Sequence, residues 1–218
     1  MTQNRSHAVM AQRAPSPDSL DYFPTPPWGT RALCEYLARH DDIAKQSCWE
    51  PACGEGHMAR ALGEYFSSVV ATDIHDYGAG YPAHDFLDAG SLMEWDTPEV
   101  DWIITNPPFN KASAFALRGI ALARVGVALL VRTSFLEGGE RYRSLFRPYP
   151  PTYILQFSER IPMFKGRLNR AGSSATAYCW ILWVQVPGGH STFKWLPPGT
   201  RARFERDDDY AEQMEFET

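Results

Sequence analysis

Hydrophobic and polar positions alternate along this chain between two periods. Short apolar runs predict buried strands, and stretches in which apolar residues recur every three or four positions predict helices. The predicted strands cover residues 48–52, 68–74, 102–105, 125–132, 153–157 and 175–186, and the predicted helices cover residues 28–40, 57–66, 112–124 and 139–146. Strands that alternate with helices indicate a doubly wound α/β fold, with an open, mostly parallel sheet between two layers of helices.

The same pattern predicts a single domain. Residues 21–202 carry all the predicted elements, and this length supports one core of ordinary size. Residues 1–20 are polar and are expected to form a disordered arm, and residues 203–218 are expected to form a solvated acidic tail. The chain has neither a run of about 18 apolar residues nor a signal-peptide pattern near residue 1, so we expect a cytoplasmic protein with no membrane partner.

The charges are unevenly distributed, although the chain of 218 residues carries a net charge of only −5. Residues 1–110 contain 6 basic and 16 acidic side chains, residues 111–202 contain 13 and 3, and residues 203–218 contain 2 and 7. Such asymmetry is typical of a polyanion-binding surface, but solvated helix faces clustered by chance also produce it.

Cysteines and histidines do not predict a metal centre. The four cysteines, Cys34, Cys48, Cys53 and Cys179, show no C-x-x-C spacing, and none of the six histidines pairs with another at metal-ligand spacing. We therefore expect reduced cysteines and no metal.

A glycine-containing turn is the first segment with candidate chemistry. Residues 50–56, Glu-Pro-Ala-Cys-Gly-Glu-Gly, follow a predicted strand and open a predicted helix. Gly54 and Gly56 allow a sharp turn and a close approach of a ligand to the helix N-terminus. Asp73, 19 positions after Gly54, ends the next strand, where a carboxylate can accept hydrogen bonds from both hydroxyls of a ribose. These features favour a nucleoside-containing cofactor over a tight structural turn.

The segment Asn106-Pro107-Pro108-Phe109 ends a third apolar strand. Two prolines keep the backbone extended and remove two N–H donors, so that the carbonyl groups of Asn106 and Pro107 can face a ligand. The Asn106 side chain adds an acceptor, and Phe109 offers a flat apolar face for stacking. This arrangement suits a planar substrate with an exocyclic amino group.

Taken together, these motifs resemble the S-adenosylmethionine-dependent amino-methyltransferases of DNA. The elements are Thr25-Pro26-Pro27, the glycine turn, Asp73 and Asn106-Pro107-Pro108-Phe109, in the motif order of the gamma group. The chain looks most like the small N6-adenine enzymes of phages and prophages, over residues 21–186. The resemblance implies a Rossmann-like class I methyltransferase sheet of about seven strands, the last one antiparallel, and S-adenosylmethionine as the cofactor. It also implies methylation of adenine N6 in DNA after base flipping, in a restriction-modification or related setting.

The resemblance also implies roles for individual residues. The implied cofactor-binding residues are Thr25, Pro26, Glu50, Pro51, Ala52, Gly54, Gly56, Asp73, Ile74, Asp85, Phe86 and Asn106. Among them, Glu50 and the turn would surround the amino and carboxylate groups of the methionine moiety, and Asp85 would accept from the cofactor adenine. The implied catalytic residues are Asn106, Pro107, Pro108 and Phe109, where Asn106 and the Pro107 carbonyl would accept from the target amine and Phe109 would stack on the flipped base.

The basic second half fits a DNA partner. The side chains expected to contact phosphates are Lys111, Arg160, Lys165, Arg167 and Arg170, and the last three lie in a polar loop within residues 160–175. Little of the chain is left for a target-recognition domain. We therefore expect a short or relaxed recognition site.

Other functions stay open at this stage. The same Asn-Pro-Pro-aromatic chemistry would serve an RNA base, a protein glutamine or cytosine N4 of DNA. A nicotinamide oxidoreductase would use Gly54 and Asp73 but gives residues 106–109 no role. A cofactor- or DNA-binding module without catalysis is the non-enzymatic alternative.

Overall fold

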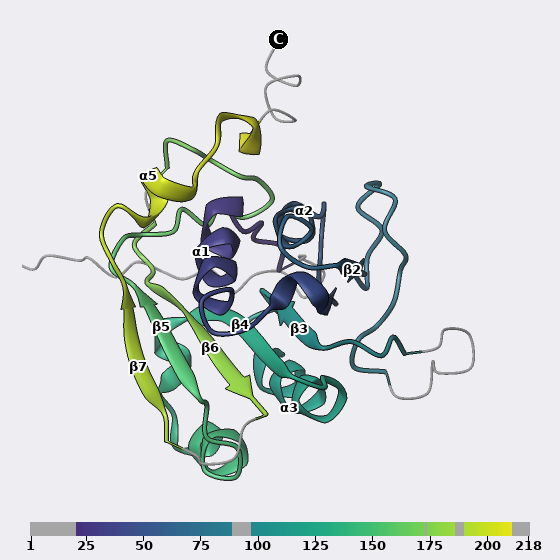
Figure 1. The fold of residues 1–218 in the computed structure, drawn as a ribbon, viewed down its shortest axis with the longest axis vertical. Coiled ribbons are helices and arrows are strands. Elements are labelled where there is room, and N and C mark those ends of the chain that lie inside the picture. The colour runs from purple at the N-terminus through teal and green to yellow at the C-terminus, as the bar shows by residue number, and fades with distance from the viewer. Residues whose placement is uncertain (1–20, 89–96, 173, 186–189, 211–218) are drawn as a thin grey trace, which may run out of the picture.

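A seven-stranded sheet is the framework of the fold (Figure 1). The structure is a computed structural model, and it describes residues 21–88, 97–172, 174–185 and 190–210. The strands are β1 (Ser47–Glu50), β2 (Ser68–Ala71), β3 (Trp102–Thr105), β4 (Gly126–Arg132), β5 (Tyr153–Phe157), β6 (Tyr178–Val184) and β7 (Thr192–Leu196). Their order across the sheet is β2-β1-β3-β4-β6-β5-β7.

Only β6 runs against its neighbours. β1 is parallel to β2 and β3, β3 is parallel to β4, and β5 is parallel to β7, whereas β6 is antiparallel to both β4 and β5. The doubly wound, mostly parallel fold predicted from the sequence is confirmed. The antiparallel strand is the sixth rather than the last, because β7 follows it. β7 was not predicted from the sequence, because its three central residues, Phe193, Lys194 and Trp195, are all exposed and show no alternation.

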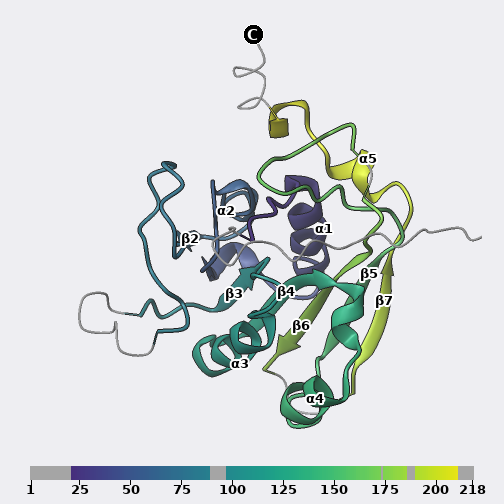
Figure 2. The same cartoon turned by 180° about the vertical axis from the view of Figure 1, so that it is seen from behind.

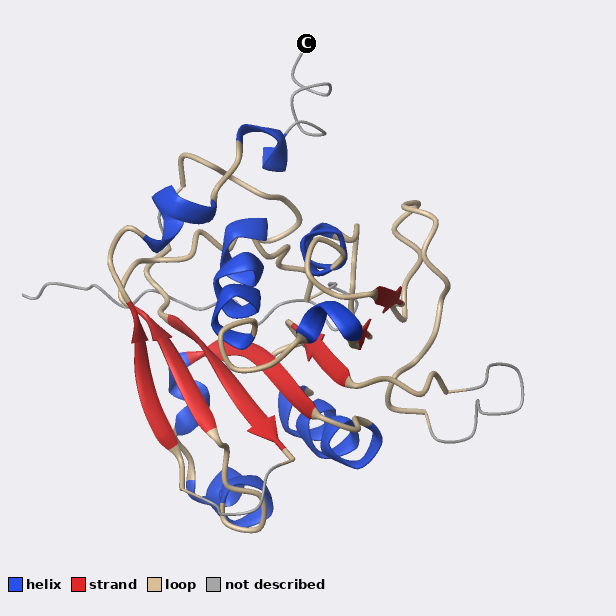
Figure 3. Cartoon of the chain, viewed as in Figure 1, coloured by secondary structure: helices blue, strands red, loops and turns tan. Residues whose placement is uncertain are grey.

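Helices cover both faces of the sheet (Figures 2 and 3). One face carries α1 (Pro27–Leu37), α2 (His57–Leu62) and α5 (Thr200–Phe204), and the other carries α3 (Ala112–Leu122) and α4 (Gly139–Arg141). A π-helical turn (Tyr142–Phe146) continues α4, and short 3₁₀ turns span Ile43–Lys45, Thr133–Leu136 and Asp207–Tyr210. Within the described ranges, no helix has the length and apolar character needed to cross a membrane.

A separate hydrophobic core lies on each side of the sheet. Trp28, Trp102 and Trp180 belong to the core beneath α1, and Trp49 and Trp183 belong to the core beneath α3. The indole Nε1 of Trp180 donates a hydrogen bond of 3.1 Å to the carbonyl of Gly29, in the first turn of α1. This bond and the apolar packing fix the start of α1 against β6, and thereby the segment that precedes it.

The segment after β7 differs from the expected solvated tail. Arg31 of α1 is buried, with 5% of its side chain exposed, and its guanidinium pairs with Glu64 at 2.9 Å and with Asp209 at 2.7 Å. Arg31 also donates to the carbonyl of Phe204 at 2.8 Å, and Tyr210 is buried. Residues 203–210 are therefore docked on α1, because their acidic run supplies a partner for a buried cation. The expected arm of residues 1–20 and the last part of the tail, residues 211–218, lie outside the described residues.

We expect Asp209→Asn to lower the free energy of unfolding by about 2 kcal/mol, because Arg31 loses a buried charged partner. Asp208→Asn is the matched control, since Asp208 is exposed and its substitution should change stability little. Urea unfolding monitored by tryptophan fluorescence measures both variants. Equal stability of the two variants would mean that the Arg31 pair does not hold this segment.

Candidate functional site

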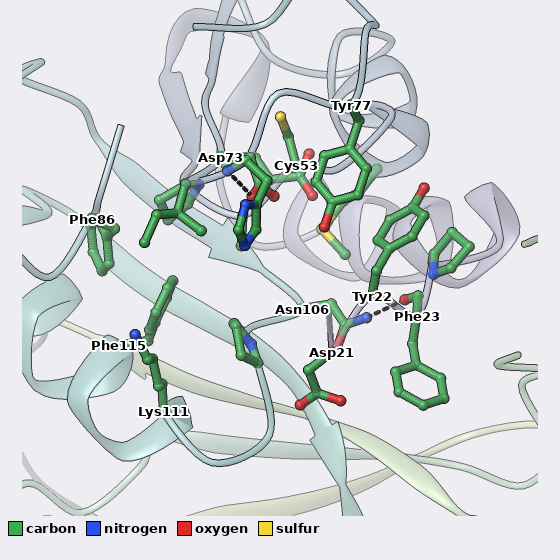
Figure 4. Close-up of a pocket in the computed structure, with 18 of the residues that line it drawn as sticks. Asp21, Tyr22, Phe23, Cys53, Asp73, Tyr77, Phe86, Asn106, Lys111 and Phe115 are labelled. Atoms are coloured by element: carbon green, nitrogen blue, oxygen red, sulfur yellow. Dashed lines mark hydrogen bonds between the residues drawn. The ribbon is translucent and has the colours of Figure 1, made fainter. Parts of the chain in front are cut away.

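A cavity of about 530 Å³ lies at the carboxyl ends of β1, β2 and β3 (Figure 4). Its walls come from the loops that follow these strands and from residues 21–25, which precede α1. In open α/β sheets this edge is the usual place for a ligand. The glycine turn, Asp73 and Asn106 fall at this edge because they follow β1, β2 and β3, and residues 21–25 bring the start of the Thr-Pro-Pro motif to the same edge.

The glycine turn after β1 has the geometry that its sequence predicts. Gly54 has φ +54° and Gly56 has φ +82°, a region that residues with a β-carbon rarely adopt. A β-carbon at position 54 would overlap the ring of Tyr22, and one at position 56 would overlap Tyr81. The turn thus requires glycine for its backbone conformation and for the close approach of two aromatic rings.

Asp73 is tied to this turn. One carboxylate oxygen accepts from the backbone N–H of Gly54 at 2.9 Å, and the other accepts from the N–H of His75 at 3.0 Å. Two backbone donors hold the carboxylate in one orientation at the edge of the cavity. Its remaining lone pairs can accept from a ligand that carries adjacent hydroxyl groups.

Glu50 is a buried carboxylate that lines the cavity. Only 2% of the residue is exposed, and its Oε2 has no hydrogen-bond partner among the described residues. Burial, reinforced by the nearby charge of Asp73, raises the pKa of Glu50 well above its usual value. A cationic group in the cavity would relieve this cost. The site therefore fits the ammonium group of an amino-acid-like ligand.

Asn106 lies at the end of β3 with its side-chain amide fixed in orientation. The amide nitrogen Nδ2 donates to the carbonyl of Phe23 at 2.9 Å and to Oγ1 of Thr25 at 3.1 Å (Figure 4). Both donors are used by the segment before α1, which leaves Oδ1 buried and without a partner in the described part of the chain. A buried, unpaired acceptor costs stability unless a ligand supplies a donor.

Phe109 does not line this cavity, although the sequence analysis places it in the catalytic motif. Its ring lies beyond Asn106, with its centroid 5.1 Å from that of Phe23 and 6.5 Å from that of Tyr178. The guanidinium of Arg132 lies 3.8 Å from the centroid of the Phe109 ring, and the Phe109 N–H donates to Asp21 at 2.9 Å.

The predicted site residues therefore divide into two groups. The cavity is lined by Thr25, Glu50, Pro51, Ala52, Asp73, Ile74, Asp85, Phe86, Asn106, Pro108 and Lys111. Pro26, Gly54, Gly56, Pro107 and Phe109 lie in the same motifs but outside the lining, as do the basic residues Arg160, Lys165, Arg167 and Arg170.

An aromatic pair that was not predicted from the sequence also lines the cavity. The rings of Tyr22 and Tyr77 lie 4.6 Å apart, and the backbone N–H of Glu55 donates to the Tyr22 hydroxyl at 3.4 Å. Burial raises the pKa of Tyr77 to about 12, so its hydroxyl stays protonated near neutral pH. The sequence feature that could have indicated this pair is Tyr22, which lies three residues before Thr25 of the Thr-Pro-Pro motif.

The predicted basic loop contacts the segment before α1. The N–H of Gly166 donates to the carbonyl of Tyr22 at 2.9 Å, which brings Lys165 and Arg167 to the same side of the molecule as the cavity. Arg170 pairs with Asp207 at 2.9 Å and with Glu205 at 3.6 Å, so part of the loop's charge is neutralised by the docked C-terminal segment.

The described residues contain no group of three or more His, Cys, Asp or Glu side chains that could hold a metal ion. No protein-family model matches the chain, and no curated protein matches it.

Solved structures share the fold. A methyltransferase subunit of a type I restriction-modification system from Streptococcus thermophilus is similar with a TM-score of 0.61 and 13% identity over 88% of this chain. A modification subunit assigned to a type I restriction enzyme from Vibrio vulnificus has a TM-score of 0.56 and 15% identity over 89% of the chain. A protein from Pyrococcus horikoshii assigned as an RNA methyltransferase has a TM-score of 0.57 and 16% identity, over 77% of this chain and 88% of its own.

The chain spans about half the length of the two restriction-modification subunits, 52% of each. At these identities the comparisons establish the fold and no more. The mixed sheet of seven strands is thus the Rossmann-like sheet found in these methyltransferase structures.

If the cavity holds S-adenosylmethionine, as the sequence motifs predict, Glu50→Gln should weaken its binding at least about tenfold, because an ionised carboxylate in a dry site is replaced by a neutral amide. In the free protein the raised pKa keeps Glu50 protonated up to a higher pH than usual, and a bound cation favours the ionised form. Binding should therefore release a proton and tighten as the pH rises.

Titration calorimetry in buffers with different ionisation enthalpies measures this release. The Glu50→Gln variant should release no proton, whereas the control Glu99→Gln, whose carboxylate is exposed at the far end of β3, should behave like the wild type. Proton release that is unchanged in Glu50→Gln would exclude Glu50 as the group that meets the cation.

Proposed function

We propose that this protein transfers a methyl group from S-adenosylmethionine to the exocyclic N6 of adenine in DNA after the base has flipped out of the helix. The observation that carries the proposal is the buried, unpaired Oδ1 of Asn106, held at the end of β3 by two hydrogen bonds of its own amide nitrogen. This oxygen can accept a hydrogen bond, and an exocyclic amine would supply the N–H donor.

The cavity next to Asn106 suits S-adenosylmethionine. Glu50 complements the ammonium group, and Asp73 can accept from both ribose hydroxyls. Asp85, the half-exposed side chain of Ile74 and the buried Phe86 also line the cavity and would contact the cofactor adenine. When bound, this cofactor supplies an activated methyl group on a sulfonium.

In this reaction the protein would contribute mainly by aligning the target amine with the methyl group, and less by acid–base chemistry. The N6 lone pair of adenine is delocalised into the ring, which makes the amine a poor nucleophile. Hydrogen bonds from its two protons to Asn106 Oδ1 and the Pro107 carbonyl would hold the nitrogen and favour a localised lone pair. Because the methyl group is already activated, positioning in a fixed polar site can supply most of the catalysis, and the amine proton can leave afterwards.

Positive charge near the cavity supports DNA as the polymer. Lys111 lines the cavity, and the loop with Lys165 and Arg167 contacts the segment that forms its wall. These side chains would bind phosphates, while Phe109 would stack on the flipped base. We further propose a short or relaxed recognition site, a gamma-type motif order as in small phage and prophage enzymes, a place in restriction-modification or a related process, and a cytoplasmic location.

The labelling experiment described below would also identify other acceptors of the methyl group. An RNA base, a protein glutamine and cytosine N4 would each present an amine to Asn106. A nicotinamide oxidoreductase leaves the oriented amide of Asn106 without a role, and so does a module that only binds cofactor or DNA. The similarity to restriction-modification subunits supports DNA, and the similarity to the Pyrococcus protein supports RNA as the second candidate.

Incubation with radiolabelled S-adenosylmethionine and unmethylated duplex DNA, followed by nucleoside analysis, should place the label in N6-methyladenine. Asn106→Ala should reduce turnover by about 100-fold, because it removes a preorganised acceptor, and cofactor affinity should change less than about threefold. Label found only in RNA or protein would overturn the choice of polymer. Wild-type turnover by Asn106→Ala would overturn the assignment of the site.

The basic loop gives a second test. Arg167 is exposed, and Arg167→Ala should lower the slope of log affinity against log salt concentration by about one, as expected for one lost phosphate contact. The matched control is Arg147→Ala. Arg147 is also exposed but precedes β5, so it lies at the other end of the sheet from the loop that follows that strand. Fluorescence anisotropy of labelled duplex DNA at several salt concentrations measures both, and equal slopes would argue against the loop as a DNA contact.

A further inference from the structure

Arg132 is a partly buried cation in contact with the catalytic motif, and the function proposed above gives it no role. It is the last residue of β4, directly opposite Tyr178 on the antiparallel strand β6. Its guanidinium carbon lies 3.8 Å from the centroid of the Phe109 ring, which is van der Waals contact. Contacts of this kind between a guanidinium and an aromatic face are attractive, and more so when water is excluded.

The described residues around Arg132 include no carboxylate that pairs with it. Its Nε is buried without an acceptor among them. Arg132 also lies opposite Tyr178 across the pair of strands β4 and β6, and Tyr178 is only 3% exposed. An apolar residue could fill the same space without burying a polar Nε that lacks an acceptor. The charge therefore points to a role in holding the ring of Phe109.

Phe109 is held from several directions. Its backbone N–H donates to Asp21, its ring touches Phe23, and the hydrophobic core beneath α1 packs against it. The carbonyl of Phe23 in turn accepts from Asn106, so ring and acceptor share one support. Arg132 reaches the ring from β4, which lies inside the sheet, and the ring itself is only half-buried. The accessible part of Phe109 is thus left for a ligand.

We infer that Arg132 is a positioning residue, which holds the ring of Phe109 at a fixed distance from Asn106 so that the ring forms the platform for the target base. The inference rests on the proposed function, because the platform has a purpose only if a planar base is brought to Asn106. Arg132 itself touches neither the base nor the cofactor. Its effect reaches the reaction only through Phe109.

The opposite arrangement makes a different prediction. Arg132 could cover the face on which the base stacks and be displaced when the base arrives. Removal of the guanidinium would then leave turnover unchanged or raise it, since the base would no longer compete with it. Removal of a supporting residue lowers turnover, because the ring gains freedom that the bound base must restrict again.

A double-mutant cycle separates these cases. The variants are Arg132→Met, which keeps the aliphatic stem, Phe109→Leu, and the two combined, with Arg132→Lys as the conservative variant. Arg143→Met, in the exposed turn after α4, controls for the loss of one positive charge. The readouts are kcat and KM for duplex DNA, the Kd of S-adenosylmethionine, and the fluorescence of 2-aminopurine at the target position.

We expect Arg132→Met to lower kcat/KM for DNA by about tenfold or more while the Kd of S-adenosylmethionine changes less than about twofold. The double variant should be no slower than Phe109→Leu alone, because each substitution removes the same platform. Arg132→Lys should recover part of the loss, since an ammonium keeps the charge but not the planar contact. The 2-aminopurine signal of the flipped base should change in Arg132→Met and not in Arg143→Met.

If the losses in kcat/KM of the two single variants multiply in the double variant, the inference is overturned. An Arg132→Met enzyme faster than the wild type would overturn it as well. If Arg132→Met does not fold, as shown by lost cofactor binding, the cycle with Arg132→Lys and Phe109→Leu decides in the same way. A wild-type protein that labels no DNA defeats the proposed function, and this inference with it. A wild-type protein that labels DNA, together with independent losses, defeats this inference alone.

Discussion

The side-chain amide of Asn106 joins the parts of this site. Its two N–H groups bind the segment before α1, at Phe23 and Thr25, more than 80 residues earlier in the chain. That segment is anchored in turn, because the first turn of α1 receives a hydrogen bond from Trp180 in the middle of the sheet. The fold therefore sets the orientation of the amide, and its oxygen is left buried without a partner in the described part of the chain. Preorganisation of this kind costs stability in the free protein and reduces the reorganisation needed during a reaction.

The two carboxylates that line the cavity are also set in place by the fold, and here the interaction with a ligand would depend on charge. Asp73 is kept in place by two backbone N–H groups, whereas Glu50 is buried deeper and left with an unpaired oxygen. Burial raises the pKa of Glu50 well above its usual value, and the nearby charge of Asp73 raises it further. A ligand that carries both a cation and hydroxyl groups satisfies the two together. Two carboxylates of the acidic first half thus line one internal cavity instead of the outer surface.

Most of the fold could be predicted from the sequence because periodicity is a local property. β3 and β5 were predicted with the bounds that the structure shows, and the glycine turn and Asp73 fall where the pattern of strands places them. The direction of the Phe109 ring could not be predicted, since it depends on Arg132 and Tyr178 from two other strands. Contacts between residues far apart in the chain leave no periodic signal in a single sequence.

The acidic segment after β7 shows the same limit for electrostatics. A run of aspartates is most simply interpreted as solvated. Asp209, however, forms an ion pair with Arg31, a cation of α1 whose side chain is buried. Its neighbours Glu205 and Asp207 pair with Arg170 of the basic loop, so the segment joins the core helix α1 to the loop beside the cavity. The field that a polyanion meets at this loop is accordingly weaker than the count of basic residues suggests. It depends on how the acidic segment is docked, because exposed charges are effective only within about 10 Å at ordinary salt concentrations. The charge asymmetry of the sequence therefore predicts the charge of the surface only once the ion-pair partner of each arginine is known.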